Sequence, residues 1–281
     1  MANKDGKTLN EDMSTGELQA MLERLKDVYG YDFTNYAEAS IRRRTLHYMS
    51  TRKISSLPAL LEILVNSEDK FEDFVQAASV TVTEMFRDPL FYKVLRIDVM
   101  KRLATYPFIK VWVAGCATGE EAYSIAILLK EEGLLERSII YATDINQQSL
   151  VQAKAGVFPL DYMKSYTINY QRSGGRNSFS QYYVANYASA LFDKSLKKHM
   201  VFAPHNLAID ESFNEFNLIL CRNVLIYFNQ KLQNRVINLF YDSLCMFGFL
   251  GLGSKESIQF TDKRDFFDVI EKKEKIFMKR A

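Results

Sequence analysis

The sequence predicts an α/β protein in which a helical domain precedes an open sheet of the nucleotide-binding type. Apolar residues recur at helical spacing through the first hundred of the 281 residues. From Val111 onward, short apolar runs typical of buried strands alternate with helical patterns. A segment rich in Tyr and Phe, approximately residues 161–202, interrupts this alternation, and we expect it to form a small inserted antiparallel β subdomain. The expected domains are residues 1–88, helical with a linker, and residues 89–281.

The composition is that of an ordinary globular protein. Hydrophobic residues make up 48% of the chain, enough for one large core or two modest ones. The 36 basic and 34 acidic residues give a net charge of +2, too balanced to indicate binding to nucleic acid. We find no long apolar run and no apolar signal core at the start, and the three cysteines lie in apolar surroundings. We therefore expect a cytoplasmic protein without membrane insertion or disulfides.

The helical domain begins with a capping box. Ser14 and Glu17 have the spacing of this motif, and Gly30 ends the apolar pattern that follows them. Three further helical patterns cover about residues 36–52, the stretch that begins at Ser56 and Pro58, and the stretch marked by Phe71, Phe74 and Val75.

The second of these helical patterns carries a basic cluster without an acid in it. One interpretation is a docking face for an acidic partner. The other is a solvated helix face whose side-chain stems pack on the core. The sequence alone leaves both open for the candidate residues Arg42, Arg43, Arg44 and Arg52.

A polar island, TVTEMFRD, separates the helical domain from the sheet. It contains Thr81, Thr83 and Arg87. Because Arg87 lies among aromatic residues, its guanidinium requires an anionic partner or several acceptors if it is partly buried. The simpler interpretation of the island is an N-cap before a helix that has Pro89 in its first turn. Both interpretations remain open.

The centre of the predicted sheet is the segment VWVAGCATGEEAYSIAILL, in which a buried strand turns directly into a helix. Gly115 and Gly119 allow a tight turn that can approach a ligand closely. Glu120 and Glu121 follow at the helix start, where carboxylates would repel a pyrophosphate. The turn therefore favours a ligand with a cationic or hydroxyl-rich end.

Polar residues also follow two other predicted strands. Asp144 follows the strand at 138–143, where an open nucleotide-binding sheet places an acid that accepts hydrogen bonds from a ribose. An N-cap for the next helix explains Asp144 equally well. Arg222 and Asn223 follow the strand at 217–221, and ligands of such sheets bind at the carboxyl ends of strands.

The remaining segments are expected to complete the sheet. They comprise a helix over 235–247, a strand over 248–253 and an antiparallel pair within 268–278. The three histidines, His47, His199 and His205, lack the spacing of metal ligands, so we predict no metal site. No Gly-x-Ser-x-Gly elbow and no Gly-Lys-Ser/Thr phosphate loop occurs.

Five motifs in order resemble the CheR-type chemoreceptor glutamate methyltransferases, namely TVTEMFRD, VWVAGCATGEEAYSIA, YATDIN, VFAPHNL and LILCRNVLIYF. The resemblance spans nearly the whole chain. It implies a Rossmann-like class I methyltransferase domain, preceded by a helical domain and carrying a small β subdomain. It also implies S-adenosylmethionine as cofactor, S-adenosylhomocysteine as product, and methyl esters formed on glutamates of a receptor's cytoplasmic coiled coil in chemotaxis adaptation. We expect a monomer.

The resemblance also assigns roles by position. One acid of the pair Glu120 and Glu121 would neutralise the methionine ammonium, and the sequence leaves open which. Tyr227 falls where the family has a tyrosine beside the methyl group. Two positions of the polar island depart from the family pattern, because Thr81 replaces an Asn and Met85 replaces a Phe. In the glycine turn, Ala122 replaces the common Pro, which should matter little in a first helical turn. The implied cofactor contacts are Thr81, Thr83, Arg87, Gly115, Glu120, Glu121, Asp144, Asn206, Leu207, Arg222 and Asn223.

The implied reaction depends on how the substrate carboxylate is placed relative to the methyl group, more than on proton transfer. A glutamate carboxylate, with a reference pKa of about 4.3, is already ionised at neutral pH. Anion and sulfonium neutralise each other in the transition state, so a dry pocket favours the reaction. We expect Arg87 to hold one carboxylate oxygen and Tyr227 to steer the other. Because receptor helices are acidic, the docking interpretation of the basic cluster is then favoured.

Two alternative functions remain. The protein could methylate a different signalling protein, since nothing in the sequence identifies the receptor. The departures at Thr81 and Met85 also suit an interaction module that binds the cofactor or its product with weak catalysis. The second alternative is opposed by the presence of Arg87, Asp144, Asn223 and Tyr227.

Overall fold

The computed structural model describes residues 13–281. Contacts divide the chain into two compact units. One contains the chain up to Val80 together with Ile226–Gln233, and the other contains Thr81–Leu225 and Asn234–Ala281. The first residues, on which the expectation of no secretion signal rests, lie outside the described part of the chain.

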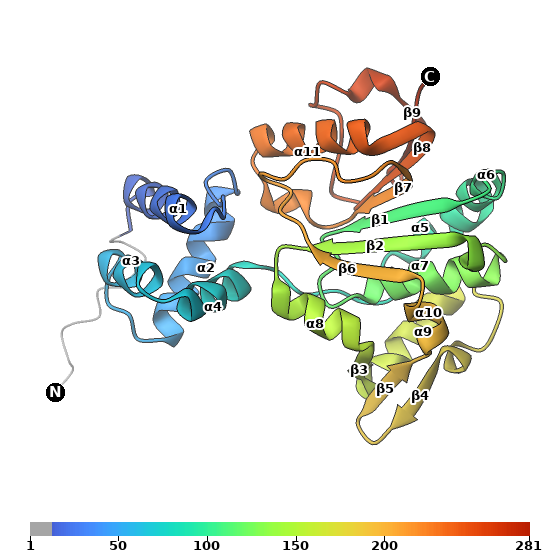
Figure 1. Ribbon diagram of the computed structural model, residues 1–281, viewed down its shortest axis with the longest axis horizontal. Helices are drawn as coiled ribbons and strands as arrows, with labels where there is room; N and C mark the ends of the chain where they lie inside the picture. Colours follow the sequence, from blue (N-terminus) through green and yellow to red (C-terminus); the bar gives the residue numbers. More distant parts are fainter. Residues whose placement is uncertain (1–12) are drawn as a thin grey trace. The chain divides into compact units, whose positions relative to one another are not determined.

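The first unit is helical, as its apolar spacing predicts (Figure 1). Ser14 and Glu17 form the predicted capping box, in which each side chain accepts the other residue's backbone N–H. Gly30 ends the first helix with a φ of 74°, which glycine adopts without strain. Leu25 and Leu60 are fully buried in the core of this unit. Its helices are α1 (Thr15–Tyr29), α2 (Glu38–Thr51), α3 (Leu57–Val65) and α4 (Glu68–Ala78).

A short segment from much later in the chain, residues 226–233, completes the helical unit. The N–H of Ala37 donates to the carbonyl of Tyr227 at 2.7 Å. Tyr36 and Phe228 form an antiparallel bridge, and their rings pack with centroids 5.0 Å apart. The sequence shows no periodic pattern that would signal this long-range pairing.

The second unit is built on a sheet that has seven strands within the described residues, in the order β6-β2-β1-β7-β8-β10-β9. Neighbours from β6 to β8 run parallel, whereas β10 pairs antiparallel with β8 and β9. This architecture confirms the predicted α/β class. The strands are β1 (Ile109–Ala114), β2 (Ser138–Asp144), β6 (Met200–Pro204), β7 (Phe216–Cys221), β8 (Leu244–Leu252), β9 (Phe267–Glu271) and β10 (Ile276–Lys279).

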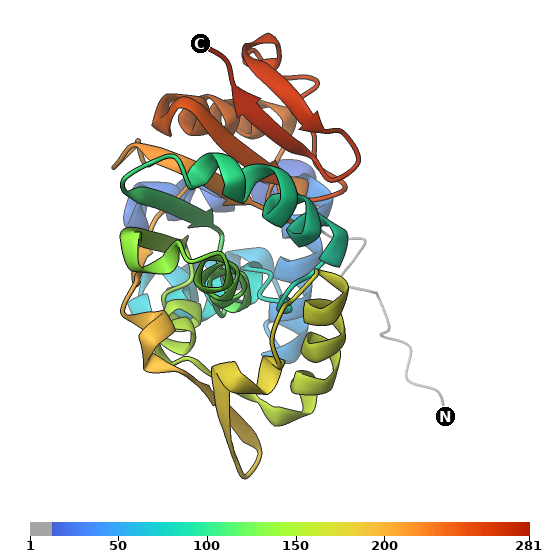
Figure 2. The same ribbon diagram turned by 90° about the vertical axis from the view of Figure 1, so that its right-hand side faces the viewer.

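The central strand β1 is buried on both faces. Val111, Trp112 and Val113 are all inaccessible, as expected for a middle strand of a parallel sheet. Helices α7 and α8 pack on β2, and β9 and β10 form the hairpin that Figure 2 shows in red near the C-terminus. The helices of the second unit include α5 (Pro89–Val94), the π-helical η1 (Leu95–Val99), α6 (Met100–Leu103), α7 (Glu120–Glu131) and α8 (Gln147–Ala155). Helix α11 (Gln230–Ser243) begins in the first unit and continues in the second from Asn234.

Helix α11 and strand β8 meet earlier than the sequence predicts. We expected a helix over 235–247 and a strand from 248, but β8 begins at Leu244. The apolar residues from 244 to 247 fit a strand as well as a helix. Leu244 pairs with Phe216 of β7, and this pairing favours the strand conformation.

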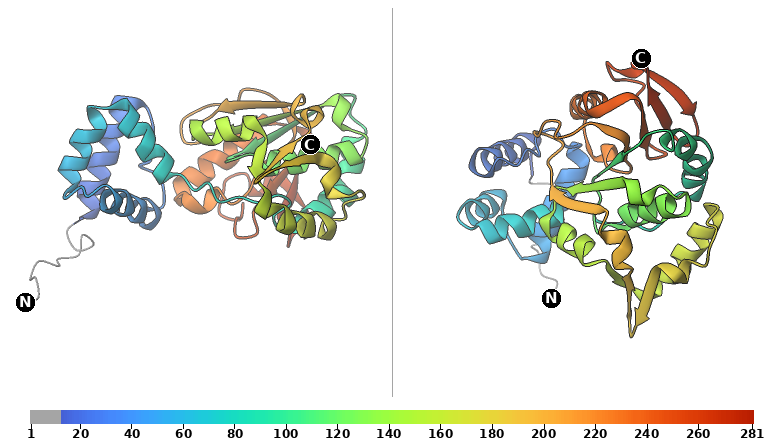
Figure 3. Two further views of the ribbon diagram at one scale, coloured as in Figure 1. Left: turned by 90° about the horizontal axis from the view of Figure 1, so that it is seen from below. Right: turned by 45° about the vertical axis from the view of Figure 1, so that its right-hand side comes forward.

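The predicted small antiparallel sheet is present, in the order β3-β5-β4, and its hairpin projects from the unit (Figure 3). Strand β3 lies just before the expected range of 161–202, and helix α9 (Met163–Arg172), which we did not predict, occupies part of that range. Met163, Tyr166 and Tyr170 form the buried side of α9, and the high Tyr content concealed their helical spacing. The other elements are β3 (Val157–Pro159), β4 (Tyr183–Asn186), β5 (Ser189–Phe192) and α10 (Lys194–Lys197). Short 3-10 turns are η2 (Leu135–Arg137), η3 (Leu160–Tyr162), η4 (Phe179–Tyr182), η5 (Leu225–Tyr227) and η6 (Arg264–Phe266).

Cys116, Cys221 and Cys245 are free thiols, as predicted. Burial raises the pKa of Cys116 and Cys221 well above the ordinary value, so both are poor nucleophiles. Between residues 13 and 281, no helix combines the length and the apolar character needed to cross a bilayer. The same part of the chain contains no cluster of His, Cys, Asp or Glu arranged to hold a metal ion.

Candidate active site

The carboxyl ends of four parallel strands, β6, β2, β1 and β7, meet at one edge of the sheet. Hydrogen bonds join the loops that follow them. The N–H of Gly115 donates to the carbonyl of Thr143 at 2.8 Å, and the N–H of His205 donates to the carbonyl of Asp144 at 3.2 Å. Ligands of open α/β sheets bind at this kind of edge. The edge brings together the predicted residues Gly115, Asp144, Asn206, Leu207, Arg222 and Asn223.

The turn between β1 and α7 depends on two glycines. Gly115 has a φ of 74°, and a Cβ atom there would lie 2.4 Å from Cγ2 of Val224. Gly119 has a φ of 100°, and a Cβ atom there would lie 2.8 Å from Cβ of Ala153. Any other residue at either position would meet both a strained backbone and a collision. The turn can therefore form a close-fitting cradle at the carboxyl edge.

Asp144 faces this cradle from the end of β2. Its Oδ2 accepts the N–H of Ala117 at 2.8 Å, and its Oδ1 accepts the N–H of Asn146 at 2.9 Å. Asn146, not Asp144, is the N-cap of α8, so the capping interpretation of Asp144 is wrong. Burial raises the pKa of Asp144, although backbone N–H groups, those of Asn146 and Ala117 foremost, oppose this rise. Each oxygen keeps a lone pair that can accept a hydroxyl of a ligand.

The two acids at the start of α7 have different partners. Glu121 accepts Arg222 Nη1 at 2.9 Å and the hydroxyl of Tyr92 at 3.2 Å. The Glu120 side chain accepts the hydroxyl groups of Thr118 at 2.6 Å and Tyr166 at 3.4 Å. Burial raises the pKa of Glu120, against the opposing hydrogen bond of Thr118. Among residues 13–281, Glu120 has no basic partner and is therefore the buried carboxylate of this pair without a neighbouring cation.

Arg222 links three parts of the site through its buried guanidinium. Besides Glu121, it binds the carboxylate of Asp88 at 2.8 Å and the carbonyl of Arg87 at 3.0 Å. The guanidinium also stacks 4.1 Å from the ring centroid of Phe91. Burial lowers the pKa of Arg222, but Glu121, Tyr92 and Asp88 together outweigh this effect and the pKa is raised. The structure thus places Arg222 as a bridge between the β7 end, α7 and the turn that carries Arg87.

Arg87 lies between two residues with left-handed backbones. Phe86 has a φ of 52° and Asp88 has a φ of 55°, which are uncommon values for these residue types. The Phe86 N–H donates to Ser124 Oγ at 3.0 Å and anchors the turn to α7. The Arg87 guanidinium makes one long hydrogen bond, 3.4 Å to the carbonyl of Val82, and no ion pair with any residue from 13 to 281. Arg87 is half-buried and available to an anionic ligand.

Met85 and Thr81, the two positions of the polar island that depart from the family pattern, differ in environment. Met85 is fully buried, and its carbonyl accepts the side-chain amide of Asn169 at 3.1 Å, so Met85 fills a core position. Thr81 and Thr83 are half-buried, and neither hydroxyl has a hydrogen-bond partner within the described chain. Both hydroxyls can therefore contact a ligand. Pro89 lies in the first turn of α5, as predicted.

Asn206 and Leu207 follow β6. The Oδ1 atom of Asn206 accepts the N–H of Ala208 at 3.0 Å, and the Asn206 N–H donates to Asp210 at 2.7 Å. These local bonds fix the loop and leave the Nδ2 donor of Asn206 without a partner in the described chain. Leu207 is buried beside it. The pair can offer one amide donor and one apolar surface to a ligand.

Asn223 is held by an acid that sequence reasoning missed. The N–H groups of Asn223 and Val224 donate to the carboxylate of Glu256 at 3.0 and 2.8 Å. Glu256 is the single acidic residue of the segment GSKESIQF, so neither periodicity nor a cluster of acidic residues marks it. Tyr92 and Tyr166, the partners of Glu121 and Glu120, were also missed. Tyr92 lies in an apolar helical stretch and Tyr166 in the segment expected to form strands, and neither position has a local signal that marks a contact with the acids.

In the helical unit, three of the four basic docking candidates have intramolecular partners. Arg42 pairs with Glu38 at 2.7 Å, and Arg52 pairs with Asp73 at 2.6 Å. Arg44 donates to a backbone carbonyl at the end of α4, and its guanidinium lies over the ring of Tyr227. Arg43 is exposed and has no such partner among residues 13–281.

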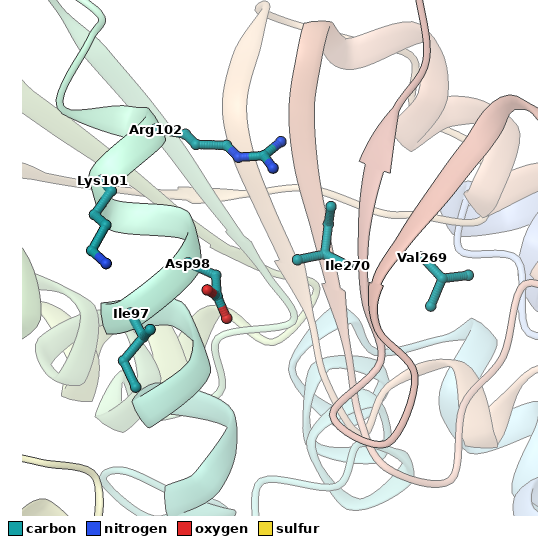
Figure 4. Close-up of a pocket in the computed structure, with 6 residues that line it drawn as sticks. All are labelled: Ile97, Asp98, Lys101, Arg102, Val269 and Ile270. Carbon is teal, nitrogen blue, oxygen red and sulfur yellow. The ribbon is translucent and has the colours of Figure 1, made fainter.

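A surface hollow of about 450 Å³ lies elsewhere in the second unit (Figure 4). Ile97, Asp98, Lys101 and Arg102 line it from the η1–α6 side, and Val269 and Ile270 of β9 line it from the other side. None of these residues belongs to the edge described above. The hollow is therefore separate from the candidate site.

Comparisons with known proteins agree with this arrangement. Residues 16–79 match the CheR methyltransferase all-alpha domain, and residues 81–276 match the CheR methyltransferase SAM-binding domain. The chain is 48% identical to "Putative methyltransferase Cher3" of Pseudomonas putida, over 94% of this chain and 96% of that protein. It is 30% identical to "Chemotaxis protein methyltransferase" of Vibrio parahaemolyticus, over 82% and 84% of the two chains. The chain therefore belongs to the CheR methyltransferase family and is an S-adenosylmethionine-dependent methyltransferase.

Proposed function

We propose that this protein transfers a methyl group from S-adenosylmethionine to glutamate side chains of chemoreceptors, in chemotaxis adaptation. The names of several relatives, chemotaxis protein methyltransferases, support the process. The observation that carries the substrate class is the state of Arg87. Its guanidinium has no acidic partner among residues 13–281, although hydrogen bonds to Ser124 and Arg222 fix the backbone turn that carries it. A guanidinium without an acidic partner on a fixed turn suits a carboxylate substrate.

The residues at the carboxyl edge fit the polar groups of the cofactor. Asp144 has free lone pairs for the ribose hydroxyls. Glu120 lacks a cation and is the better partner for the methionine ammonium, because Glu121 is already neutralised by Arg222. When bound, S-adenosylmethionine supplies a methyl group that a positively charged sulfur activates. The further proposed contacts are Thr81, Thr83, Arg87, Gly115, Asn206, Leu207 and Asn223.

In the proposed reaction the protein orients reactants and excludes water. The substrate carboxylate needs no base, since it is ionised at neutral pH. Arg87 would hold one carboxylate oxygen and leave the other as the nucleophile. Correct placement of two reactants can supply roughly 7 to 11 kcal/mol. Tyr227 is proposed as the second catalytic residue from its place in the family pattern alone.

The helical unit is proposed to dock an acidic receptor coiled coil. The structure narrows the candidates, because Arg42, Arg44 and Arg52 already serve intramolecular contacts. Arg43 is left as the main docking charge, on an exposed face of α2 that it shares with His47. A cytoplasmic, monomeric enzyme is part of the proposal.

A labelling experiment tests the proposal. The purified protein is incubated with methyl-labelled cofactor and membranes that contain a chemoreceptor, and label released by base is counted as ester. The wild type should label the receptor, and Arg87→Ala should reduce the rate by about a hundredfold or more. Arg172→Ala, an exposed arginine of the same unit, is the matched control and should have no effect.

Each alternative function has its own outcome in this assay. Base-labile label on another protein of a lysate, with none on the receptor, would indicate a different signalling substrate. Tight binding of S-adenosylhomocysteine without any label would indicate an interaction module. Wild-type labelling by Arg87→Ala would remove the catalytic role of that residue.

A further inference from the structure

Glu256 is a buried carboxylate whose protein partners are backbone N–H groups. It is 4% exposed. Its two oxygens accept the N–H groups of Gly253, Asn223 and Val224 at 2.5, 3.0 and 2.8 Å. Within the described residues it makes no ion pair. A buried acid with this surrounding has its negative charge balanced by backbone dipoles alone.

The turn that Glu256 binds has a left-handed residue. Asn223 adopts a φ of 61°, in a region that few non-glycine residues occupy and that Asn tolerates better than most. Successive N–H groups in such a turn point to one side and form a concave site for an anion. Asn223 and Val224 are half-buried, so without an acceptor there their N–H groups would lose hydrogen bonds that water could replace only in part. The carboxylate of Glu256 therefore stabilises this conformation of the turn.

The same turn forms a wall of the cradle. Val224 lies so close to Gly115 that a Cβ atom on the glycine would meet Val224 Cγ2 at 2.4 Å. On the other side, a Cβ atom on Gly253 would lie 2.8 Å from the backbone nitrogen of Asn223. The turn is thus enclosed between the end of β8 and the glycine turn after β1. A small shift of the turn would change the shape of the cradle.

We propose that Glu256 is a positioning residue for the cofactor, because its carboxylate fixes the Asn223–Val224 turn against the glycine turn. It acts through Asn223 and Val224 and does not itself contact the ligand. The inference rests on the proposed placement of the cofactor at Asn223 and extends it to a residue outside the family motifs used above. Glu256 should therefore set cofactor affinity more than turnover.

The test replaces the carboxylate with groups of graded ability to accept the N–H donors. Glu256→Gln keeps the size but turns one acceptor oxygen into an amide donor that faces the N–H groups. Glu256→Asp keeps the charge with a shorter reach. S-adenosylhomocysteine binding is measured by titration calorimetry, which needs no receptor, and the KM for S-adenosylmethionine and kcat are measured separately.

Glu131→Gln is the matched control. Glu131 is also a buried acid that accepts several donors, including Tyr182 at 2.9 Å, but it lies at the far end of α7 beside the insertion. Its replacement should lower the melting temperature without changing the Kd for S-adenosylhomocysteine. A general loss of packing is thereby separated from a change at the cradle.

We expect Glu256→Gln to raise the Kd for S-adenosylhomocysteine and the KM for the cofactor by about tenfold or more, with kcat at saturation within about twofold of wild type. Glu256→Asp should recover part of the affinity and keeps the test valid if Glu256→Gln does not fold. Wild-type affinity in either folded variant at this position would overturn the inference and leave the proposed function intact. Failure of the wild type to bind S-adenosylhomocysteine would overturn both.

Discussion

The guanidinium carbon of Arg44 lies 4.7 Å from the centroid of the Tyr227 ring. Arg44 Nη1 also donates to the carbonyl of Ala78 at 2.6 Å, so the side chain joins α2, the end of α4 and the segment that carries Tyr227. Burial lowers the pKa of Arg44. The sequence pattern assigned Arg44 to receptor docking. Its contact with Tyr227 instead gives Arg44 a role in supporting the Tyr227 ring.

Replacement of Arg44 by lysine should therefore affect turnover. Lysine keeps the charge but loses the planar surface that stacks on the ring and the fixed hydrogen-bond geometry. If Tyr227 is catalytic as proposed, kcat should fall by about tenfold while cofactor affinity stays unchanged. Steady-state kinetics at saturating receptor measure this. An unchanged kcat with a raised KM for the receptor would instead return Arg44 to the docking face.

The different partners of Glu120 and Glu121 predict different phenotypes. Glu120→Gln removes the carboxylate that lacks a cation, so S-adenosylhomocysteine should bind about tenfold more weakly with little change in melting temperature. Titration calorimetry and thermal denaturation provide the two readings. Unchanged affinity in Glu120→Gln would contradict the assignment of the ammonium to Glu120.

Glu121→Gln should reduce the stability of the protein more than its affinity for S-adenosylhomocysteine. It leaves Arg222 buried with only Asp88 as acidic partner, and removal of one partner from a buried ion pair costs about 3 kcal/mol or more. The free energy of unfolding, measured in urea, should fall accordingly. A stability equal to that of Glu120→Gln would show that the Arg222–Glu121 pair is not a major support of the site.

The hydrogen bonds that Glu131 accepts lead us to expect a loss of folding stability at low pH. Burial raises the pKa of this carboxyl, but hydrogen bonds from Tyr170, Arg96 and the Arg176 N–H together outweigh it, so its pKa is below 4.5 in the folded protein. The stabilisation is thus fully present above pH 4.5 and is lost as the pH falls through the folded-state pKa. Urea unfolding of wild type and Glu131→Gln should converge as the pH falls. A constant difference between them down to pH 3 would contradict this assignment.

Arg43 predicts a salt-dependent receptor interaction. Charge reversal in Arg43→Glu should raise the KM for receptor several-fold at low ionic strength, because α2 would then repel an acidic coiled coil. The effect should shrink as salt is added. Arg172→Glu makes the same charge change on an exposed residue of the insertion and serves as control. Equal effects of the two reversals would indicate a response to net charge alone.

The sequence predicted most of the fold because its signals were local and periodic. The capping box at Ser14, the stop at Gly30 and the apolar run of β1 each depend on neighbours a few residues away. Helix α9 was missed because a composition rich in Tyr favours strands, whereas burial at helical spacing decided the outcome. The residues predicted to bind the cofactor followed motifs at strand ends, and the parallel topology brings those of the four central strands together.

The supporting residues of the site could not be predicted in the same way. Glu256, Tyr92 and Tyr166 act through contacts with residues distant in sequence, and no spacing rule links them to their partners. Glu120 and Glu121 are adjacent and look equivalent in the sequence. Their different partners in the fold assign them different roles. Only the fold shows which carboxylate Arg222 neutralises.

The helical unit is discontinuous, since residues 226–233 leave the methyltransferase fold and pack with the first eighty residues. The two family domains are consecutive in the sequence, yet the chain interlaces them. An exchange of N-terminal domains between family members by a single crossover near residue 80 would therefore separate Tyr36 and Ala37 from their partners Phe228 and Tyr227. Recombination should succeed only when both stretches are inherited together, which ties the evolution of the N-terminal helices to that of the loop after β7.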